Sequence, residues 1–322
     1  MISIENLKKY YGDFPAVDDI SFTVQSGEIL GFLGPNGAGK TTTMKVITGY
    51  YPPTAGRVTV KGKDVVADSL ETRQMIGYLP ESTPLYLDLT VSEYLHYIAE
   101  LRQIPEGEHA ERIDRITTLT GLTDRMQQPL GQLSKGYRQR VGLAQAMVHD
   151  PDILILDEPT IGLDPNQIVE IRSLIREIGR EKTVILSTHI LPEVQATCDR
   201  VVIINEGRIV ADGTPDELQS RFEGQAVIDL QVYGDGSDDT EPFNQVHGVV
   251  NVERMPDPEP NVHRMQIMAE QGTDPRGELF RLCVRKEWTL LGMTRKIQSL
   301  EDIFQQLTRS DAAHQQREED AA

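Results

Sequence analysis

A glycine-rich run that ends in Lys-Thr carries the groups that a bound phosphate needs. Its residues are Gly34, Pro35, Asn36, Gly37, Ala38, Gly39, Lys40 and Thr41, which fit the pattern G-x-x-x-x-G-K-S/T. Glycines let the backbone curl so that successive N–H groups face a β-phosphate at the positive end of a helix. We expect Lys40 to reach the β- and γ-phosphates, the Thr41 hydroxyl to ligate Mg²⁺, and Thr42 to contact the nucleotide.

The segments on both sides of this loop favour phosphate binding over a glycine-rich turn without a ligand. The apolar run Ile29 to Leu33 predicts a strand that leads into the loop, and TTTMKVI predicts a helix that leaves it. Strand, loop and helix therefore follow one another in the order that a nucleotide site requires.

Two adjacent carboxylates, Asp157 and Glu158, follow a second apolar run, Ile153 to Leu156. A strand of this kind delivers its last residues to the edge of the sheet where α/β proteins bind ligands. Alone, the pair is as well explained by a solvated strand end. Beside a phosphate-binding loop, we expect Asp157 to hold Mg²⁺ through its water shell and Glu158 to accept a proton from the attacking water.

The segment LSKGYRQR, residues 133–140, resembles the LSGGQ signature of ABC ATPases and stands shortly before the two carboxylates. Alone, it would be an ordinary helix start with Ser134 as N-cap. The resemblance implies that Ser134 and Gly136 contact the γ-phosphate of an ATP held by a partner subunit. It also implies a head-to-tail homodimer, or pseudo-dimer, with two ATP molecules between the subunits.

Further segments resemble other parts of the same family, and together they cover residues 1 to about 220. Tyr11 resembles the aromatic residue that stacks on adenine, although Tyr10 is close enough to take its place. The segment PTIGLD, which ends at Asp164, resembles the loop that crosses the dimer interface and contacts nucleotide. His189, in STH, resembles the histidine that contacts the γ-phosphate and orients the catalytic water. The resemblance thus implies three catalytic residues, Lys40, Glu158 and His189.

The chain departs from the family pattern at two places. Glu81 stands where most members have a glutamine; a carboxylate can ligate Mg²⁺ or hold a water, but it cannot donate a hydrogen bond. Lys135 and Tyr137 replace the usual Gly and Gln of the signature. Because Ser134 and Gly136 keep the phosphate-facing positions, we expect activity to survive.

The fold class expected for 1–220 is α/β, a P-loop NTPase core of the ABC ATPase type with a largely parallel sheet covered by helices. Four apolar runs predict its strands: Ile2 to Leu7, Ile29 to Leu33, Ile153 to Leu156 and Thr183 to Ser187. Residues 84–147 lack such runs and predict an inserted helical lobe, with helices at Val91 to Leu101 and Lys135 to Val148.

Residues 221–309 predict a small α+β domain of ferredoxin-like type, with elements in the order βαββαβ. The predicted elements are strands at 226–233, 249–255, 263–269 and 289–294, helices at 242–246 and 276–287, and a final helix at 300–307. The polar tail, 310–322, predicts disorder.

Composition bears on location and partners. The 322 residues include no run of about 18 to 20 apolar residues and no leader pattern, and Cys198 and Cys283 lack metal-ligand spacing. We expect a cytoplasmic protein, peripheral on the inner face of the plasma membrane through a permease. A net charge of −18 without a basic stripe argues against nucleic acid as a partner.

The leading functional hypothesis is the ATP-hydrolysing subunit of an exporter, with ATP and Mg²⁺ as cofactors and a separately encoded membrane permease as partner. YLPE, LSKGYRQRV and the closing SLEDIFQQLT resemble bacterial exporter ATPases of the drug, polysaccharide and gliding-motility type. A translation factor would carry two cassettes, and a DNA-repair ATPase a long heptad insertion. An importer is a weaker alternative, disfavoured by the Glu81 and signature variants.

Overall fold

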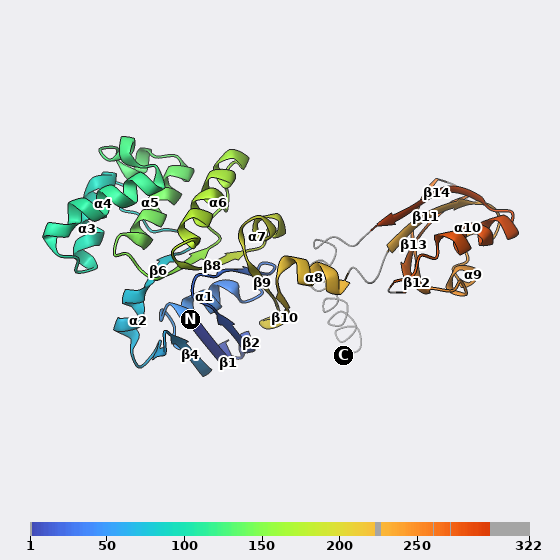
Figure 1. Cartoon of the computed structure of the whole chain (residues 1–322), viewed down its shortest axis with the longest axis horizontal. Helices are drawn as coiled ribbons and strands as arrows, with labels where there is room; N and C mark the ends of the chain where they lie inside the picture. The colour runs from blue at the N-terminus through green and yellow to red at the C-terminus, as the bar shows by residue number, and fades with distance from the viewer. Residues whose placement is uncertain (1, 223–226, 260, 271, 297–322) are drawn as a thin grey trace. The chain divides into compact units, whose positions relative to one another are not determined.

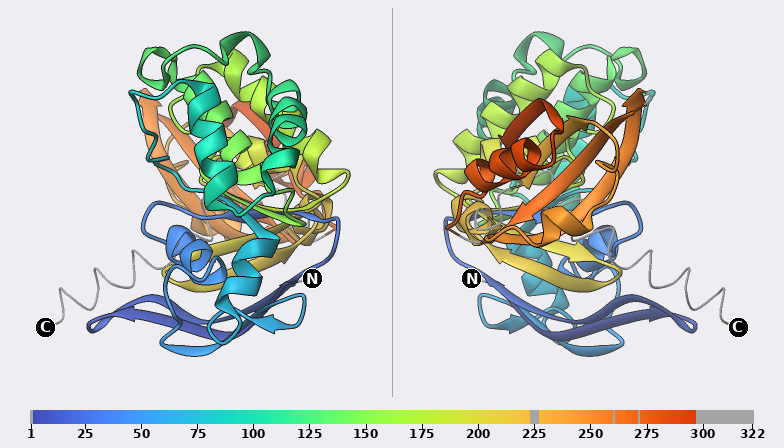
Figure 2. Two further views of the ribbon diagram at one scale, coloured as in Figure 1. Left: turned by 90° about the vertical axis from the view of Figure 1, so that its left-hand side faces the viewer. Right: turned by 90° about the vertical axis from the view of Figure 1, so that its right-hand side faces the viewer.

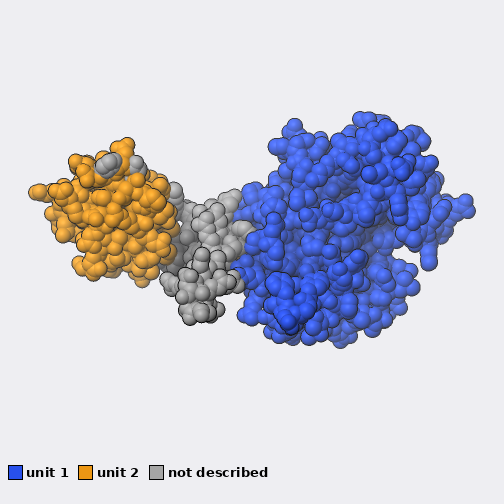
Figure 3. Space-filling view, turned by 180° about the vertical axis from the view of Figure 1, so that it is seen from behind, with its two compact units in different colours: residues 1–214 blue, residues 215–322 orange. Residues whose placement is uncertain are grey.

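The structure is a computed structural model that describes residues 2–222, 227–259, 261–270 and 272–296. The chain divides into two compact units between Thr214 and Pro215 (Figure 3). The sequence placed this boundary near residue 220, which lies inside helix α8 (Pro215–Phe222). A sequence pattern can indicate a helix, but it does not show which unit the helix packs against.

A six-stranded sheet forms the centre of the first unit (Figure 1). Its order is β10 (Arg208–Gly213), β9 (Arg200–Asn205), β3 (Ile29–Leu33), β8 (Thr183–Thr188), β7 (Ile153–Asp157) and β6 (Ile76–Leu79). All neighbours are parallel except β9 and β10. Because β3, β7 and β8 are buried along their whole length, they read as continuous apolar runs. Their carboxyl ends share one edge of the sheet.

A separate antiparallel sheet corrects one expectation. Its order is β2 (Phe14–Val24), β1 (Ile2–Tyr11), β4 (Ala55–Val60) and β5 (Lys63–Asp64). The run Ile2 to Leu7 therefore does not join the parallel sheet; it pairs antiparallel with β2 and β4. A short apolar run cannot reveal its neighbours. Helix α1 (Lys40–Ile47) buries Met44 and Val46 in the core that it shares with strands of both sheets.

The helical lobe contains α3 (Val91–Leu101), α4 (Glu106–Thr120) and α5 (Lys135–Met147), with short 3-10 turns at Thr123–Arg125 and Leu130–Gln132. Both predicted helices are present, whereas α4 was not predicted. The lobe and the antiparallel sheet lie on opposite sides of the six-stranded sheet (Figure 2). Three further helices complete this unit: α2 (Ser69–Met75), α6 (Pro165–Gly179) and α7 (Leu191–Thr197).

After α8, the second unit has the elements β11 (Val227–Tyr233), α9 (Glu241–Asn244), β12 (Val249–Glu259), β13 (Val262–Ala269), α10 (Arg276–Arg285) and β14 (Thr289–Lys296). The strands form an antiparallel sheet of order β12-β13-β11-β14, which is that of a ferredoxin-like module. Phe243 and Trp288 stack in its core. The helix predicted at 300–307 and the tail lie outside the described residues. Among the helices that are described, none has the length and apolar character to span a bilayer.

Candidate active site

The loop between β3 and α1 closes around the ammonium group of Lys40. Nζ of Lys40 donates to the carbonyl oxygens of Gly34 at 2.8 Å and Pro35 at 3.1 Å. At Gly39, whose φ is 104°, an added Cβ would lie 2.5 Å from the carbonyl oxygen of Ala16. Only glycine fits this left-handed, closely packed position. The backbone can therefore curl as phosphate binding requires.

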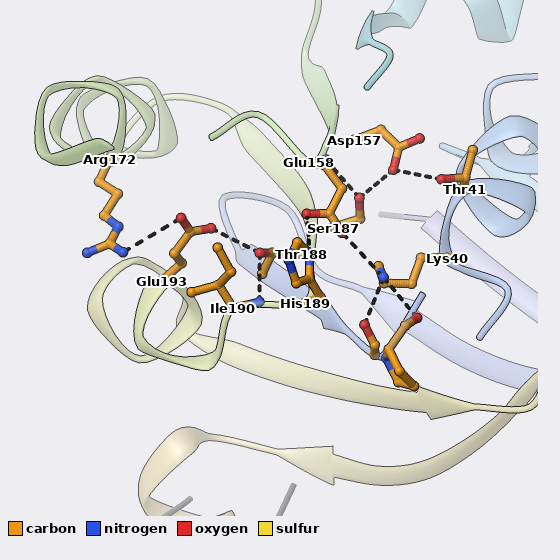
Figure 4. A network of polar contacts seen from close by, with 12 residues as sticks. Lys40, Thr41, Asp157, Glu158, Arg172, Ser187, Thr188, His189, Ile190 and Glu193 are labelled. Atoms are coloured by element: carbon orange, nitrogen blue, oxygen red, sulfur yellow. Dashed lines mark hydrogen bonds and ion pairs between the residues drawn. The ribbon is translucent and has the colours of Figure 1, made fainter. Parts of the chain in front are cut away.

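Glu158 stands at the meeting point of two other predicted catalytic residues (Figure 4). Its Oε1 lies 3.3 Å from Nζ of Lys40, and its Oε2 lies 2.9 Å from Nδ1 of His189. The Glu158 backbone has a φ of 50°, which is unusual for a residue with a side chain. Such strain persists where surrounding contacts hold it, and it often marks functional sites. Here the N–H of Glu158 is held by the carbonyl oxygen of Ser187 at 3.1 Å.

Asp157 is fully buried at the end of β7, and its carboxylate is only partly satisfied. Its Oδ1 accepts hydrogen bonds from Thr41 Oγ1 at 3.2 Å and from Ser187 Oγ at 2.5 Å. Its Oδ2 has no hydrogen-bond partner among the described residues. A buried carboxylate oxygen without a partner, beside a threonine hydroxyl, suits a hard cation such as Mg²⁺.

No group of three or more His, Cys, Asp or Glu side chains suited to a metal gathers in the described parts of the chain. This does not argue against Mg²⁺, which is usually held by one or two carboxylates together with substrate phosphates. The hydroxyl of Tyr78, on the neighbouring β6, is buried nearby. Burial raises the pKa of Tyr78, and the charge of Asp157 raises it further, so this phenol stays neutral.

A pocket of about 410 Å³ brings most of the predicted residues together. It is lined by Tyr11, Phe14, Ala16, Asn36, Gly37, Gly39, Lys40, Thr41, Thr42, Glu81, Glu158 and Ile161. Of the two candidate tyrosines, Tyr11 lines it, whereas the Tyr10 hydroxyl donates to Asp18 at 3.3 Å. Gly34, Pro35 and Ala38 belong to the same loop but are not among the lining residues.

Several contributors were missed from the sequence, among them Phe14 and Ser187. Phe14 lines the pocket beside Tyr11, its partner across the β1–β2 pair. Ser187 bonds both Asp157 and the Glu158 backbone. The signal for Ser187 was its place at the end of a buried strand, two residues before His189. Nothing in the sequence pattern distinguished Phe14 from other residues of an edge strand.

Ser134, Gly136 and Asp164 do not line this pocket. The Ser134 hydroxyl caps α5 by accepting the N–H of Tyr137 at 3.4 Å, and the Asp164 carboxylate caps α6 by accepting the N–H of Gln167 at 2.9 Å. An added Cβ at Gly136 would lie 2.6 Å from the Gln167 side chain. Within one chain, the three residues are thus held at two helix starts and do not line the pocket that Lys40 lines.

Comparisons with known proteins agree with this geometry. The family model described as ABC transporter matches residues 17–161. The chain is 38% identical over 237 residues to the linearmycin resistance ATP-binding protein LnrL of Bacillus subtilis, a match that covers 73% of this chain and 76% of that relative. It is 36% identical over 236 residues to the Nod factor export ATP-binding protein I of Ralstonia nicotianae, with 73% of each chain covered.

Among solved structures, an ATP-binding subunit of an ABC transporter is similar to this chain, with 32% identity and a TM-score of 0.63. The similarity covers 69% of this chain and 93% of that subunit. Family match, relatives and fold agree with a pocket that is lined by the glycine-rich loop, Lys40 and Glu158. The chain therefore belongs to the ABC transporter family, as one of its ATP-binding, ATP-hydrolysing subunits.

Proposed function

We propose that this chain powers an exporter by ATP-driven closure of a dimer, working on a separately encoded membrane permease at the inner face of the membrane. The single observation that carries the proposal is the pocket in which Lys40, Glu158 and Glu81 meet, while the signature residues stand outside it. The export direction is supported by two relatives, named for resistance to linearmycin and for export of Nod factor.

ATP lies with its phosphates on the loop from Gly34 to Thr41, where backbone N–H groups and Lys40 face the β- and γ-phosphates. Tyr11 stacks on the adenine. A water attacks the γ-phosphorus, the bond from this phosphorus to the bridging oxygen of ADP breaks, and Glu158 accepts the water's proton. His189 contacts the γ-phosphate and orients the water.

Asp157, through its water shell, would hold Mg²⁺ together with the oxygens of Thr41 and Glu81. The metal would neutralise charge on the phosphate oxygens. The protein's own part is positional: Ser187 holds one oxygen of Asp157 and leaves the other available.

A second copy completes each site. Ser134, Gly136 and Asp164 act on the nucleotide of the partner subunit, which accounts for their absence from the pocket of their own chain. The N-terminus of α5 supplies N–H groups and the Ser134 hydroxyl to the γ-phosphate across the interface. ATP thus joins two subunits, and hydrolysis lets them separate.

The test is reconstitution with a membrane protein identified from the neighbouring reading frames or by co-purification with this chain. Vesicles that contain both should accelerate ATP hydrolysis and move a cargo outward when ATP is supplied on the side of this chain, and Glu158→Gln should abolish both effects. Inward transport would refute the exporter assignment. Failure of the two proteins to associate would refute the choice of partner.

A further inference from the structure

Glu193 is a buried carboxylate that the catalytic scheme does not use. It lies in the first turn of α7, four residues after His189, and its side chain is 1% exposed. A charged side chain is rarely buried so fully unless it has partners. One partner is Thr188, whose hydroxyl donates to Glu193 Oε2 at 2.9 Å. The contact joins α7 to the last residue of β8.

Thr188 connects Glu193 with the turn that carries His189. Its hydroxyl donates to Glu193 and accepts the N–H of Ile190 at 3.0 Å (Figure 4). The second bond links the residues on either side of His189. Hydroxyls that bond a backbone N–H two residues on stabilise tight turns. A hydroxyl can turn its proton in several directions, and the carboxylate fixes that proton toward Glu193.

His189 depends on this turn because little else holds it. Its side chain is 36% exposed, and within the described residues its ring is hydrogen-bonded through Nδ1 to Glu158 Oε2 at 2.9 Å. A partly exposed imidazole can rotate, so the orientation of the ring is set mainly by the backbone that carries it. On one side of His189 the Thr188 hydroxyl holds the N–H of Ile190, and on the other the carbonyl oxygen of Thr188 accepts the N–H of Gly34 at 3.3 Å.

The second oxygen of Glu193 faces α6. Nη2 of Arg172 lies 3.7 Å from Oε1, and that oxygen makes no hydrogen bond within the described residues. This cation offsets part of the cost of burying the carboxylate. Since Asp164 caps the start of α6, this helix joins the residue proposed to face the partner subunit to the cation that holds Glu193.

We propose that Glu193 is a positioning residue for His189, acting through the Thr188 hydroxyl and held in place by Arg172. The proposal rests on the proposed role of His189 in orienting the catalytic water. Glu193 touches neither phosphate nor water; it fixes the turn so that the imidazole meets Glu158 and the nucleotide together. Loss of this contact lowers the rate of hydrolysis and leaves ATP binding unchanged.

The experiment compares Glu193→Ala, Glu193→Gln and Thr188→Val in the full chain, with turnover, the dissociation constant of ATP with Mg²⁺, and the melting temperature measured for each. Glu193→Ala and Thr188→Val should each lower kcat about tenfold or more, the effect of one lost hydrogen bond to a charged group. Affinity for ATP should stay within about twofold of wild type. Glu193→Gln keeps an oxygen that accepts from Thr188 and should retain most of the activity.

The matched control is Thr183→Val, at the other end of β8. Thr183 is also buried, and its hydroxyl also accepts a backbone N–H, that of Gly27 at 2.9 Å. This substitution removes the same kind of group from the same strand, so it should lower the melting temperature like Thr188→Val and leave kcat near wild type. Equal losses of kcat in the two variants would mean that Thr188 acts only on stability.

A double-mutant cycle with His189→Ala decides whether Glu193 acts through the histidine. Once the imidazole is absent, Glu193→Ala should cause no further loss of the residual turnover. The proposal would be overturned if the loss of kcat in the double variant equalled the product of the two single losses, or if Glu193→Ala had normal turnover. Either result would leave the role of His189 intact. Normal turnover of His189→Ala would instead refute the catalytic role proposed for His189.

Discussion

Nζ of Lys40 lies 3.3 Å from Oε1 of Glu158, and both side chains are only 6% exposed. The same ammonium donates to two carbonyl oxygens of its own loop. The cation proposed to meet the γ-phosphate is thus paired with the carboxylate proposed as base. When ATP binds, its phosphate oxygens must replace one of these partners of Lys40. If they replace Glu158, its carboxylate becomes free to face the attacking water.

The first prediction concerns Glu158→Gln. Turnover should fall at least about a hundredfold, because an amide cannot accept the water's proton. ATP should bind more tightly than to wild type, since one negative charge near the phosphates is gone. Steady-state hydrolysis and equilibrium binding of ATP, with light scattering to detect a trapped dimer, measure these effects. Glu181→Gln, at an exposed position of the same unit, is the control and should behave as wild type.

Near-normal hydrolysis by Glu158→Gln would remove this residue from the role of base. Unchanged affinity for ATP would mean that the ion pair with Lys40 does not compete with the phosphates.

The second prediction concerns Glu81, which lines the pocket with Lys40 and Glu158. Without Mg²⁺, its carboxylate repels the triphosphate, so Glu81→Gln should bind ATP about tenfold more tightly than wild type in EDTA. With Mg²⁺ between the charges, the gap should shrink. Titration of a fluorescent ATP analogue under both conditions measures it.

Asp88→Asn provides the comparison, because Asp88 is an exposed acid of the same loop that does not line the pocket. Equal affinities of wild type and Glu81→Gln under both conditions would place the Glu81 carboxylate away from the nucleotide, and its effect would then be mechanical.

The third prediction concerns acid stability. Burial lowers the pKa of His149 to about 4, and the nearby charge of Arg102 acts in the same direction. In the unfolded chain the pKa is about 6.5, so the unfolded state binds the proton first as the pH falls. The stability contributed by neutral His149 is therefore complete above about pH 6.5 and is lost progressively toward pH 4.

His149→Gln should remove this part of the acid sensitivity, which we expect to be on the order of 2 kcal/mol. Gln keeps a donor for the carbonyl oxygen of Ile76, which lies 3.2 Å from the His149 ring nitrogen Nε2. Denaturant unfolding of wild type and variant at pH 7.5 and pH 4.5 measures the difference. Identical pH dependence of the two proteins would show that folding does not lower the pKa of His149.

Much of the site could be predicted because its strands are buried on both faces. The runs Ile29 to Leu33 and Ile153 to Leu156 are apolar throughout, and each is followed at once by polar residues of the site. Since parallel strands bring their carboxyl ends to one edge, Lys40 and Asp157 were expected together from sequence alone. The pocket that joins Lys40, Thr41 and Glu158 agrees with that expectation.

Other parts could not be predicted because their patterns are weak or depend on tertiary packing. Helix α4 buries His109, Thr117 and Thr120 beside its isoleucines, so its apolar stripe is interrupted. The sequence of Ile2 to Leu7 predicts a strand but does not indicate which sheet the strand joins. From the sequence, Glu193 would be expected to be a solvated acid in the first turn of a helix. Its burial depends on tertiary contacts with Arg172 of α6 and Thr188 of β8.

The central claim is that each ATP is hydrolysed between the loop of one copy and the signature of another. Lys40→Ala removes the first half of a site, and Ser134→Arg blocks the second. Each variant alone should be inactive because both of its sites are defective. A mixed dimer contains one site with both defects and one intact composite site.

The most direct measurement is therefore ATP hydrolysis by Lys40→Ala and Ser134→Arg, assayed separately and after mixing at equal concentrations. The account predicts that the separate proteins stay inactive and that the mixture regains turnover, which rises with protein concentration as mixed dimers form. A mixture that remains inactive, with both variants folded and wild type active, would contradict a site shared between two copies.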